Sequence, residues 1–113
     1  MRYLFILALI AQVAVAAPPS TCALDSPYER ALCSYQRRNF ADAEAGFRSI
    51  VDAGAREPET LRATYFLGRT LMKTGRFDEA SALFVRIYST DKAFYDTWNC
   101  DFLLGECRKA LGK

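Results

Sequence analysis

The chain has 113 residues, with 15 lysines and arginines against 13 aspartates and glutamates, and it contains no histidine. Its small net charge of +2 gives no reason to expect a nucleic acid or an acidic membrane as partner. The absence of histidine removes the usual general base of hydrolases and the commonest zinc ligand. We therefore expect one small domain with no metal, no cofactor and no enzymatic activity.

Residues 1–16 have the pattern of a secretory signal peptide. Arg2 precedes an apolar run that begins at Tyr3, and Ala14-Val15-Ala16 supplies an A-x-A cleavage pattern. A membrane anchor is the alternative, but the run over 3–17 is shorter than the roughly 20 residues that a helix needs to cross a bilayer. The sequence predicts cleavage after Ala16, export to the periplasm or the cell exterior, and no membrane span in the mature chain.

The four cysteines of a small exported chain favour disulfides over a metal site. Cys22 precedes an expected helix that contains Cys33, so the chain can fold back and form a bridge worth about 3 kcal/mol. Cys100 and Cys107 would lie about 10 Å apart in a straight helix, so a bridge between them requires the helix to start or bend near Asp101. Free thiols or an intermolecular bond are the alternatives for that pair.

The expected elements begin after an irregular lead-in over 17–25, where two consecutive prolines oppose a helix. Ser26 as N-cap and Pro27 at the first helical position predict a helix from Pro27 to Arg38. Asn39 is placed to cap a second helix, which ends near Gly54.

The second half of the chain predicts three more helices. The third opens at Glu57-Pro58-Glu59 and ends at Gly75, and the fourth runs from Phe77 to about Ser89. Residues 90–95 are expected to be a connector. The fifth helix is predicted from Asp96 to Leu111, with a charged outer side that suits a helix covering the last apolar face.

The stretch from Leu67 to Ile87 reads Leu-Gly-x-x-Leu-x-x-x-Gly-x-Phe-x-x-Ala-x-x-x-Phe-x-x-Ile. Gly68 and Ala80 are small where two antiparallel helices should cross, so the backbones can approach and Phe84 can fill the space beside them. This pattern resembles the tetratricopeptide repeat, a helical hairpin that stacks in tandem.

An offset of 37 residues brings further copies into register. The matched sets are Phe40, Ala43, Ala45, Phe47 and Ile50 with Phe77, Ala80, Ala82, Phe84 and Ile87; Ala31, Gly68 and Gly105; Tyr28, Tyr65 and Phe102; Leu67 and Leu104; and Gly75 and Gly112. The resemblance implies an all-α superhelix of about two and a half hairpins and five helices in a domain over 26–113. Its repeats would span about 27–54, 58–90 and 95–113.

In tetratricopeptide arrays the first helices of successive repeats line a concave groove that holds a peptide. By resemblance, the ligand-binding positions are Tyr28, Tyr35, Arg62, Tyr65, Arg69, Lys73, Phe102 and Lys109, and the groove also includes Leu32, Met72, Asn99 and Glu106. Independently, Arg62, Tyr65 or Phe66, Arg69 and Lys73 recur at helical spacing and share one face, and three cations beside an aromatic residue suit a carboxylate ligand. The alternative is the solvated side of an amphipathic helix.

The leading hypothesis is therefore a non-enzymatic protein-binding module of the cell envelope that holds a protein or peptide segment in its groove. The alternative is a self-associating structural protein that stacks through its terminal helices, driven by the apolar face of the fifth helix and an unpaired cysteine. An enzyme with a catalytic thiol is disfavoured, because a cysteine nucleophile needs a base and the chain has no histidine.

Overall fold

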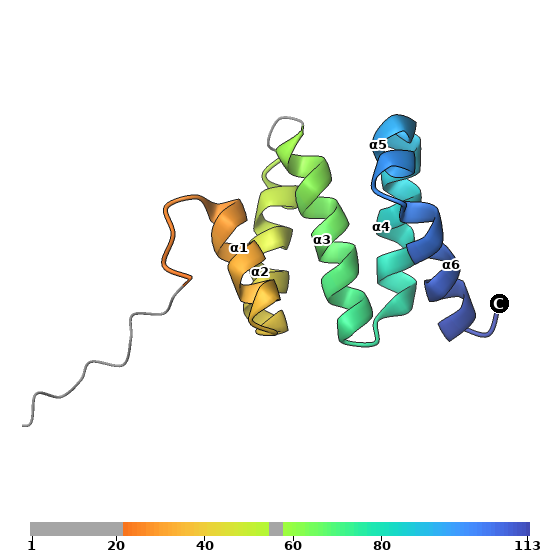
Figure 1. Cartoon of the computed structure of the whole chain (residues 1–113), viewed down its shortest axis with the longest axis horizontal. Coiled ribbons are helices and arrows are strands. Elements are labelled where there is room, and N and C mark those ends of the chain that lie inside the picture. Colours follow the sequence, from red (N-terminus) through yellow and green to blue (C-terminus); the bar gives the residue numbers. More distant parts are fainter. Residues whose placement is uncertain (1–21, 55–57) are drawn as a thin grey trace, which may run out of the picture.

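A computed structural model describes residues 22–54 and 58–113, and in these residues the chain is all-α, as predicted (Figure 1). The signal peptide predicted over 1–16 and the first part of the lead-in lie outside the described residues. The helices are α1 (Pro27–Gln36), α2 (Phe40–Asp52), α3 (Glu59–Lys73), α4 (Phe77–Thr90), α5 (Lys92–Thr97) and α6 (Cys100–Ala110).

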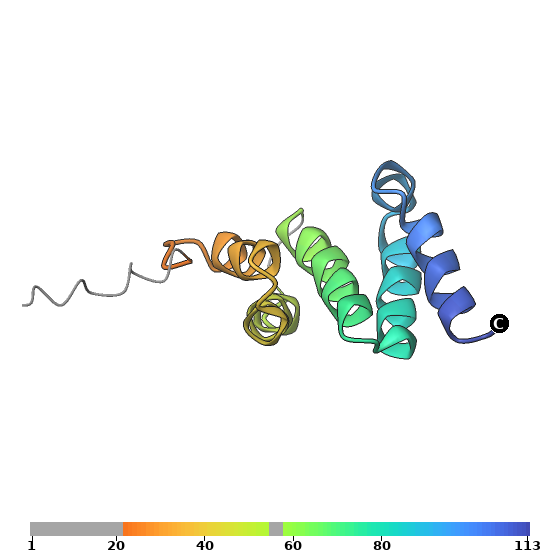
Figure 2. The ribbon, with the colours of Figure 1, turned by 60° about the horizontal axis from the view of Figure 1, so that its bottom comes forward.

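The helices stand side by side in chain order, and each long helix packs on its neighbours in the sequence. α1 packs on α2 and α3 packs on α4 as antiparallel hairpins, while α2 packs on α3 and α6 packs on α4 (Figure 1, Figure 2). The short helix α5 lies at the end of α4 from which the chain turns back into α6. Within the described residues, none of these helices has both the length and the apolar character needed to cross a membrane.

The predicted helix starts of the first hairpin are confirmed. Ser26 precedes Pro27 at the first helical position, and its Oγ accepts a hydrogen bond of 3.4 Å from the Glu29 backbone N–H. Asn39 caps α2, because its Oδ1 accepts from the Asp42 backbone N–H at 3.4 Å and its Nδ2 donates to the Asp42 carboxylate at 2.7 Å. Both caps satisfy backbone donors that the first helical turn leaves unpaired.

The 37-residue offset is present in the backbone as well as in the side chains. Arg38, Gly75 and Gly112 all adopt the left-handed conformation, with φ of 64°, 79° and 74°. In each turn the next residue donates its N–H to the carbonyl five positions back, which closes the helix end. The bonds run from Asn39 to Ser34 at 2.8 Å, from Arg76 to Leu71 at 2.8 Å and from Lys113 to Arg108 at 2.9 Å.

The expected connector over 90–95 and the expected count of five helices are wrong. Asp91 accepts a hydrogen bond of 3.0 Å from the Phe94 N–H and so caps the additional helix α5. The chain then breaks at Asn99, whose φ of 54° is left-handed, and α6 begins at Cys100 rather than at Asp96. The described residues therefore form six helices, one of which, the short α5, was not predicted from the sequence pattern.

The two hairpins depend on small residues where their helices cross. A Cβ added at Gly68 would lie 2.8 Å from Cζ of the fully buried Phe84, and one added at Gly46 would lie 2.8 Å from Cβ of Ala31. Gly105 is the equivalent of Gly68 at the 37-residue offset, but a Cβ added there would meet nothing within 4 Å. Close crossing is thus a property of α1–α2 and α3–α4, whereas α6 lacks a crossing helix at this position among the described residues.

Much of the core comes from positions that the 37-residue offset matches, although the matched Ala45 and Ala82 are exposed. Phe47 and Phe84 are fully buried, as are Ala43 and Ala80 at the equivalent crossing positions. The two buried threonines do not disrupt this core, because each hydroxyl donates to a carbonyl one turn earlier in α3. The bonds run from Thr64 to Thr60 and from Thr70 to Phe66, each at 2.7 Å.

The predicted disulfide between Cys22 and Cys33 is present, with the Cα atoms 5.4 Å apart. It fastens the described end of the lead-in to α1. The Arg30 side chain assists, because its Nη1 donates to the carbonyls of Leu24 at 2.6 Å and of Asp25 at 2.8 Å.

The predicted disulfide between Cys100 and Cys107 is wrong, because both thiols are free and fully buried. Both residues belong to α6, where a separation of seven residues places them about 10 Å apart along the axis, beyond the reach of a bridge. Their burial also removes them as the unpaired cysteine that was expected to drive self-association.

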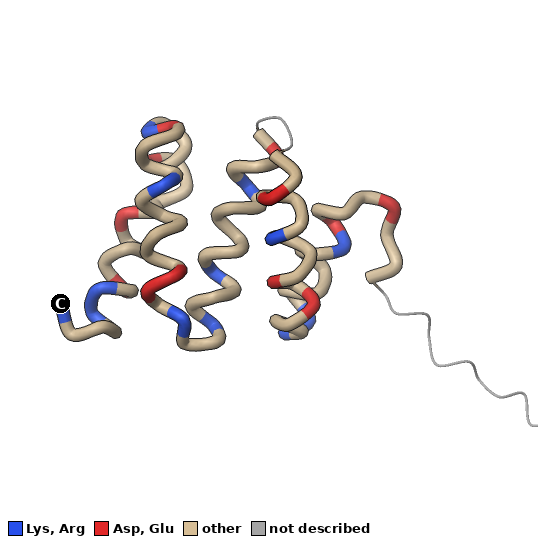
Figure 3. Tube along the Cα trace, turned by 180° about the vertical axis from the view of Figure 1, so that it is seen from behind, with Lys and Arg blue, Asp and Glu red and all other residues tan. Residues whose placement is uncertain are grey.

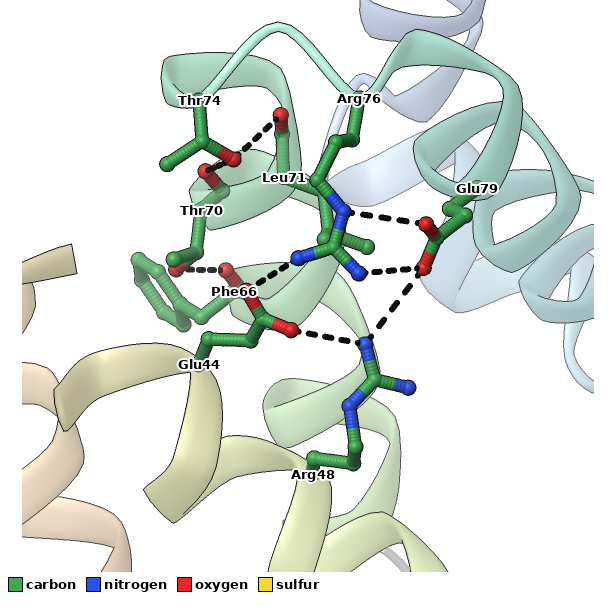
Figure 4. Close-up of polar contacts among 8 residues, drawn as sticks. All are labelled: Glu44, Arg48, Phe66, Thr70, Leu71, Thr74, Arg76 and Glu79. Carbon is green, nitrogen blue, oxygen red and sulfur yellow. Dashed lines mark hydrogen bonds and ion pairs between the residues drawn. The ribbon is translucent and has the colours of Figure 1, made fainter. Parts of the chain in front are cut away.

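Four charged side chains join the two hairpins (Figure 4). Glu44 and Arg48 lie on α2, and Arg76 and Glu79 lie at the start of α4. Arg76 donates to Glu44 at 2.6 Å and to Glu79 at 2.9 and 3.0 Å, while Arg48 lies 3.1 Å from Glu44 and 3.6 Å from Glu79. Positive and negative side chains alternate in this network, and its bond between Glu44 and Arg76 joins residues 32 positions apart in the sequence.

The pKa of Glu44 reflects this tie. Burial alone would raise its pKa, but the hydrogen bonds from Arg76 and Arg48 outweigh burial and hold the pKa below its ordinary value of 4.5. The ionised carboxylate is therefore favoured by the folded state.

The crossing at Gly68 gives the first testable prediction. We expect Gly68→Leu to lower the free energy of unfolding by about 3 kcal/mol, because the added side chain must displace Phe84 from a filled core. The matched variant Gly105→Leu should change stability by less than about 1 kcal/mol, since its position is open. Thermal unfolding followed by circular dichroism measures both, and equal losses in the two variants would contradict the hairpin crossing.

The network gives a prediction with a defined pH dependence. We expect Glu44→Gln to lower the free energy of unfolding by about 1 kcal/mol at neutral pH. Because the folded pKa lies below the unfolded one, this contribution is complete above pH 4.5 and is lost as the pH falls through the folded pKa. Urea unfolding of both forms from pH 7 to 3 tests it, with Glu106→Gln as an exposed helical control. A difference independent of pH would refute the assignment.

Candidate functional site

The inner side of α1 and α3 is held together by aromatic rings, and Phe66 is their common neighbour. Its ring centroid lies 5.6 Å from that of Tyr35, 5.7 Å from Phe47, 6.2 Å from Trp98 and 6.3 Å from Tyr28. Each such edge-to-face or stacked pair adds about 0.5–1.5 kcal/mol beyond the area that it buries. Sequence reasoning named Phe66 only as an alternative to Tyr65, although both residues occupy one turn of α3.

Tyr65 is not available to a ligand, which corrects its expected role. Its side chain is only 7% exposed, and its ring packs 4.9 Å from Trp98 and 6.3 Å from Phe84. The cover comes from Trp98, which directly follows the unforeseen helix α5. The pattern at the equivalent positions Tyr28 and Phe102 gave no signal of this burial.

Arg69 is held in position by two tyrosines. Its guanidinium carbon lies 5.7 Å from the ring centroid of Tyr35 and 5.8 Å from that of Tyr65, and its Nη1 donates to the Tyr65 hydroxyl at 3.5 Å. Within the described residues, no carboxylate lies within 4.0 Å of Arg69 or Lys73. Arg69 is thus ordered by its tyrosine neighbours and Lys73 is exposed, and neither has a counterion among the described residues. This arrangement suits a carboxylate from another molecule.

A hollow of about 290 Å³ lies beside these cations, between α3, the start of α4, and α6. Phe102 on its rim is 60% exposed, which is unusual for a large apolar side chain. The residues that line it are Arg69, Met72, Lys73, Phe77, Phe102, Leu103 and Glu106. The structure thus brings together Arg69, Lys73 and Phe102 of the predicted site and adds Phe77 and Leu103, which sequence reasoning did not include.

The remaining predicted positions lie outside this hollow. Tyr28 and Tyr35 are half-buried in the aromatic cluster around Phe66, and Arg62 and Lys109 are exposed. Burial raises the pKa of Tyr28, against the opposing effect of the nearby Arg62. The predicted site is therefore divided: one part is a structural aromatic cluster and the other is an accessible hollow.

The charged residues of the described chain do not form one large patch. Figure 3 shows basic and acidic positions interspersed along the helices. A larger hollow of about 350 Å³ lies between α1 and α2, but its one cation, Arg30, already binds the carbonyls of Leu24 and Asp25. The hollow at Arg69 is the better candidate, since among the described residues Arg69 and Lys73 have no carboxylate within 4.0 Å.

The chemistry of the described residues offers neither a metal centre nor a reactive thiol. No group of three or more potential metal ligands occurs in residues 22–54 and 58–113. Burial raises the pKa of Cys100 to about 11, and it also raises that of Cys107 despite the opposing effect of Ser81. Both thiols are therefore protonated at neutral pH and closed to solvent, unlike a cysteine nucleophile.

The chain was compared with protein-family models, with curated proteins and with solved structures, and none of them matches it.

Tyr35 supplies a prediction about the aromatic cluster. Its buried hydroxyl makes no hydrogen bond within the described residues, so we expect Tyr35→Phe to keep or raise stability by up to about 1 kcal/mol. Tyr95→Phe is the matched control, because it removes a bond of 3.2 Å to Asp101 and should cost about 1 kcal/mol. Urea unfolding measures both, and a loss at Tyr35 as large as that at Tyr95 would show that the hydroxyl has a partner.

Proposed function

We propose that this chain is a non-enzymatic protein-binding module of the tetratricopeptide type that holds a segment of another protein at the hollow between α3 and α6. The 37-residue recurrence of the turns, crossings and core residues supports the repeat assignment. In such an arrangement α1, α3 and α6 line a superhelical groove, and the hollow belongs to its α3 and α6 part.

The observation that carries this proposal is the combination, in one concave site, of an exposed aromatic ring and two cations that have no carboxylate within 4.0 Å among the described residues, although Glu106 also lines the site. Arg69 is already ordered between two tyrosine rings, so little side-chain entropy is lost when it binds. Lys73 and Phe102 lie on the same rim, so a carboxylate and an apolar side chain of one segment can be bound together. The preferred ligand is a segment that places an aspartate or glutamate beside an aromatic or aliphatic residue.

The cell envelope is the proposed compartment. The chain contains the Cys22–Cys33 disulfide. Disulfides form and persist in oxidising compartments and are rare in the cytosol. Together with the predicted signal peptide, this disulfide supports a periplasmic or secreted protein whose partner is another exported protein or peptide.

The direct test selects ligands for the purified chain from a phage-displayed library of random peptides. We expect enrichment of sequences with an acidic residue next to an apolar one, and about tenfold weaker binding of the best peptide to Lys73→Glu and to Phe102→Ser. Fluorescence anisotropy with the labelled peptide gives the affinities.

Arg86→Glu is the matched control, because Arg86 is an exposed cation of α4 that does not line the hollow. It should bind the peptide as the wild type does. Failure to enrich any sequence, or equal losses in Lys73→Glu and Arg86→Glu, would refute the proposed function.

A further inference from the structure

α4 and α6 share a second face, on the side of α6 away from the hollow at Arg69, that the described residues do not cover. We call it the end face and define it by Val85 and Tyr88 of α4 with Asp101, Leu104, Gly105 and Arg108 of α6. Val85 is 45% exposed and Tyr88 is 50% exposed, whereas Leu104 is only 7% exposed and forms the buried edge of this face. With Tyr95, all of these residues except Gly105 line a hollow of about 300 Å³.

The preceding hairpin shows what such a face is built to bind. The positions 37 residues earlier are buried: Val51 is 7% exposed, Thr64 4%, and Leu67 and Leu71 1% each. There α4 crosses α3 at Gly68, whose equivalent in α6 is Gly105. A Cβ at Gly105 would meet nothing within 4 Å, so an antiparallel helix can pack closely on the end face at this position.

The end face differs from the covered one in its charges. The network residues Glu44 and Arg48 of α2 are replaced at the equivalent positions of α4 by Ser81 and Val85. The end face therefore lacks the groups that bind Arg76 and Glu79 between the hairpins. A further hairpin of the same kind could not form the ion-pair network that joins the first two hairpins. A helix with a different charge pattern therefore suits the end face better.

α6 itself has the required complementarity. Asp101 and Arg108 have opposite charges and lie two turns apart on one flank, with Leu104 and Gly105 midway between them. In a twofold antiparallel pair of α6 helices, Asp101 of each copy faces Arg108 of the other. Gly105, which is exposed, then lies against the partner helix beside the largely buried Leu104, and its missing side chain permits close approach.

We propose that the end face is a homodimer interface in which the α6 helices of two copies pack antiparallel, with Val85 and Tyr88 buried at its border. The hollow at Arg69 lies on the other flank of α6, at Phe102, Leu103 and Glu106, and stays open in the dimer. The dimer would present two such hollows, and its formation does not depend on the proposed ligand.

The test is sedimentation velocity of the disulfide-bonded chain over a range of concentrations. The wild type should change from monomer to dimer as its concentration rises. Asp101→Arg and Arg108→Asp each place like charges opposite one another, so each should raise the dissociation constant at least about tenfold. A wild type that stays monomeric at all concentrations, or a dimer that neither variant weakens, would overturn the proposal.

Mixing the two variants is the sharper measurement. The Asp101→Arg chain carries an arginine at both contact positions, and the Arg108→Asp chain carries an aspartate at both. In a mixed dimer each contact therefore joins an arginine to an aspartate, so complementarity returns. Native mass spectrometry should show the mixed dimer at concentrations where each variant alone is monomeric. Absence of the mixed dimer would rule out the twofold antiparallel geometry.

Gly105→Gln guards against effects on folding. Asp101→Arg also removes the bond from the Tyr95 hydroxyl to Asp101, whereas Gly105→Gln adds a side chain where the monomer has open space. At concentrations where the wild type is monomeric, we expect this variant to melt no lower than the wild type, and at higher concentrations we expect it to dimerise at least about tenfold more weakly. Unchanged dimerisation would contradict close approach of the helices at Gly105.

Discussion

The fold depends on close helix crossing inside each hairpin. A helical hairpin of this length cannot bury its own apolar face, and it becomes stable only when its backbones approach and a neighbour covers it. At Gly68 the approach leaves no room for a Cβ, because the ring of Phe84 occupies that space. The pair Ala31 and Gly46 does the same for the first hairpin. From these two crossings follow the positions of α1 and α3, and hence the side on which a ligand can bind.

The interactions between the hairpins have a different character from those within them. Inside a hairpin, apolar shape decides the fit, whereas between α2 and α4 the tie is the network of Glu44, Arg48, Arg76 and Glu79. Such a network adds modest stability but defines which faces meet. On the inner side, the ring of Phe66 joins α1 and α3 and helps to hold Arg69 at the edge of an accessible hollow. A structural role and a proposed binding role thus fall within one turn of α3.

The sequence predicted the features that depend on local chemistry or on the repeat. The N-caps at Ser26 and Asn39 and the Cys22–Cys33 bridge have direct local signals, and each of them is present. The 37-residue offset predicted core positions of both hairpins, but two of its matched residues, Ala45 and Ala82, are exposed. The matched residues that are buried are Ala43, Phe47, Ile50, Ala80, Phe84 and Ile87.

Other features need tertiary contacts that one sequence does not display. Asp91 caps a helix of only six residues, too short for a periodic pattern to reveal, and the two-helix ending of the chain was therefore missed. Tyr65 is buried because Trp98 covers it, so its misassignment follows from the same error. The tie from Glu44 to Arg76 links residues far apart in the sequence, and Arg38 adopts a left-handed turn without being glycine.

Nuclear Overhauser contacts in solution test the central claim, the close crossing, most directly. The account predicts strong contacts between the Gly68 Hα protons and the Phe84 ring, with the Gly68 signals shifted by the ring current, and a second contact between Ala31 and Gly46. A helical, folded chain in which Gly68 shows neither the contacts nor the shift would contradict the crossing, and with it the hollow and the end face that the hairpins create.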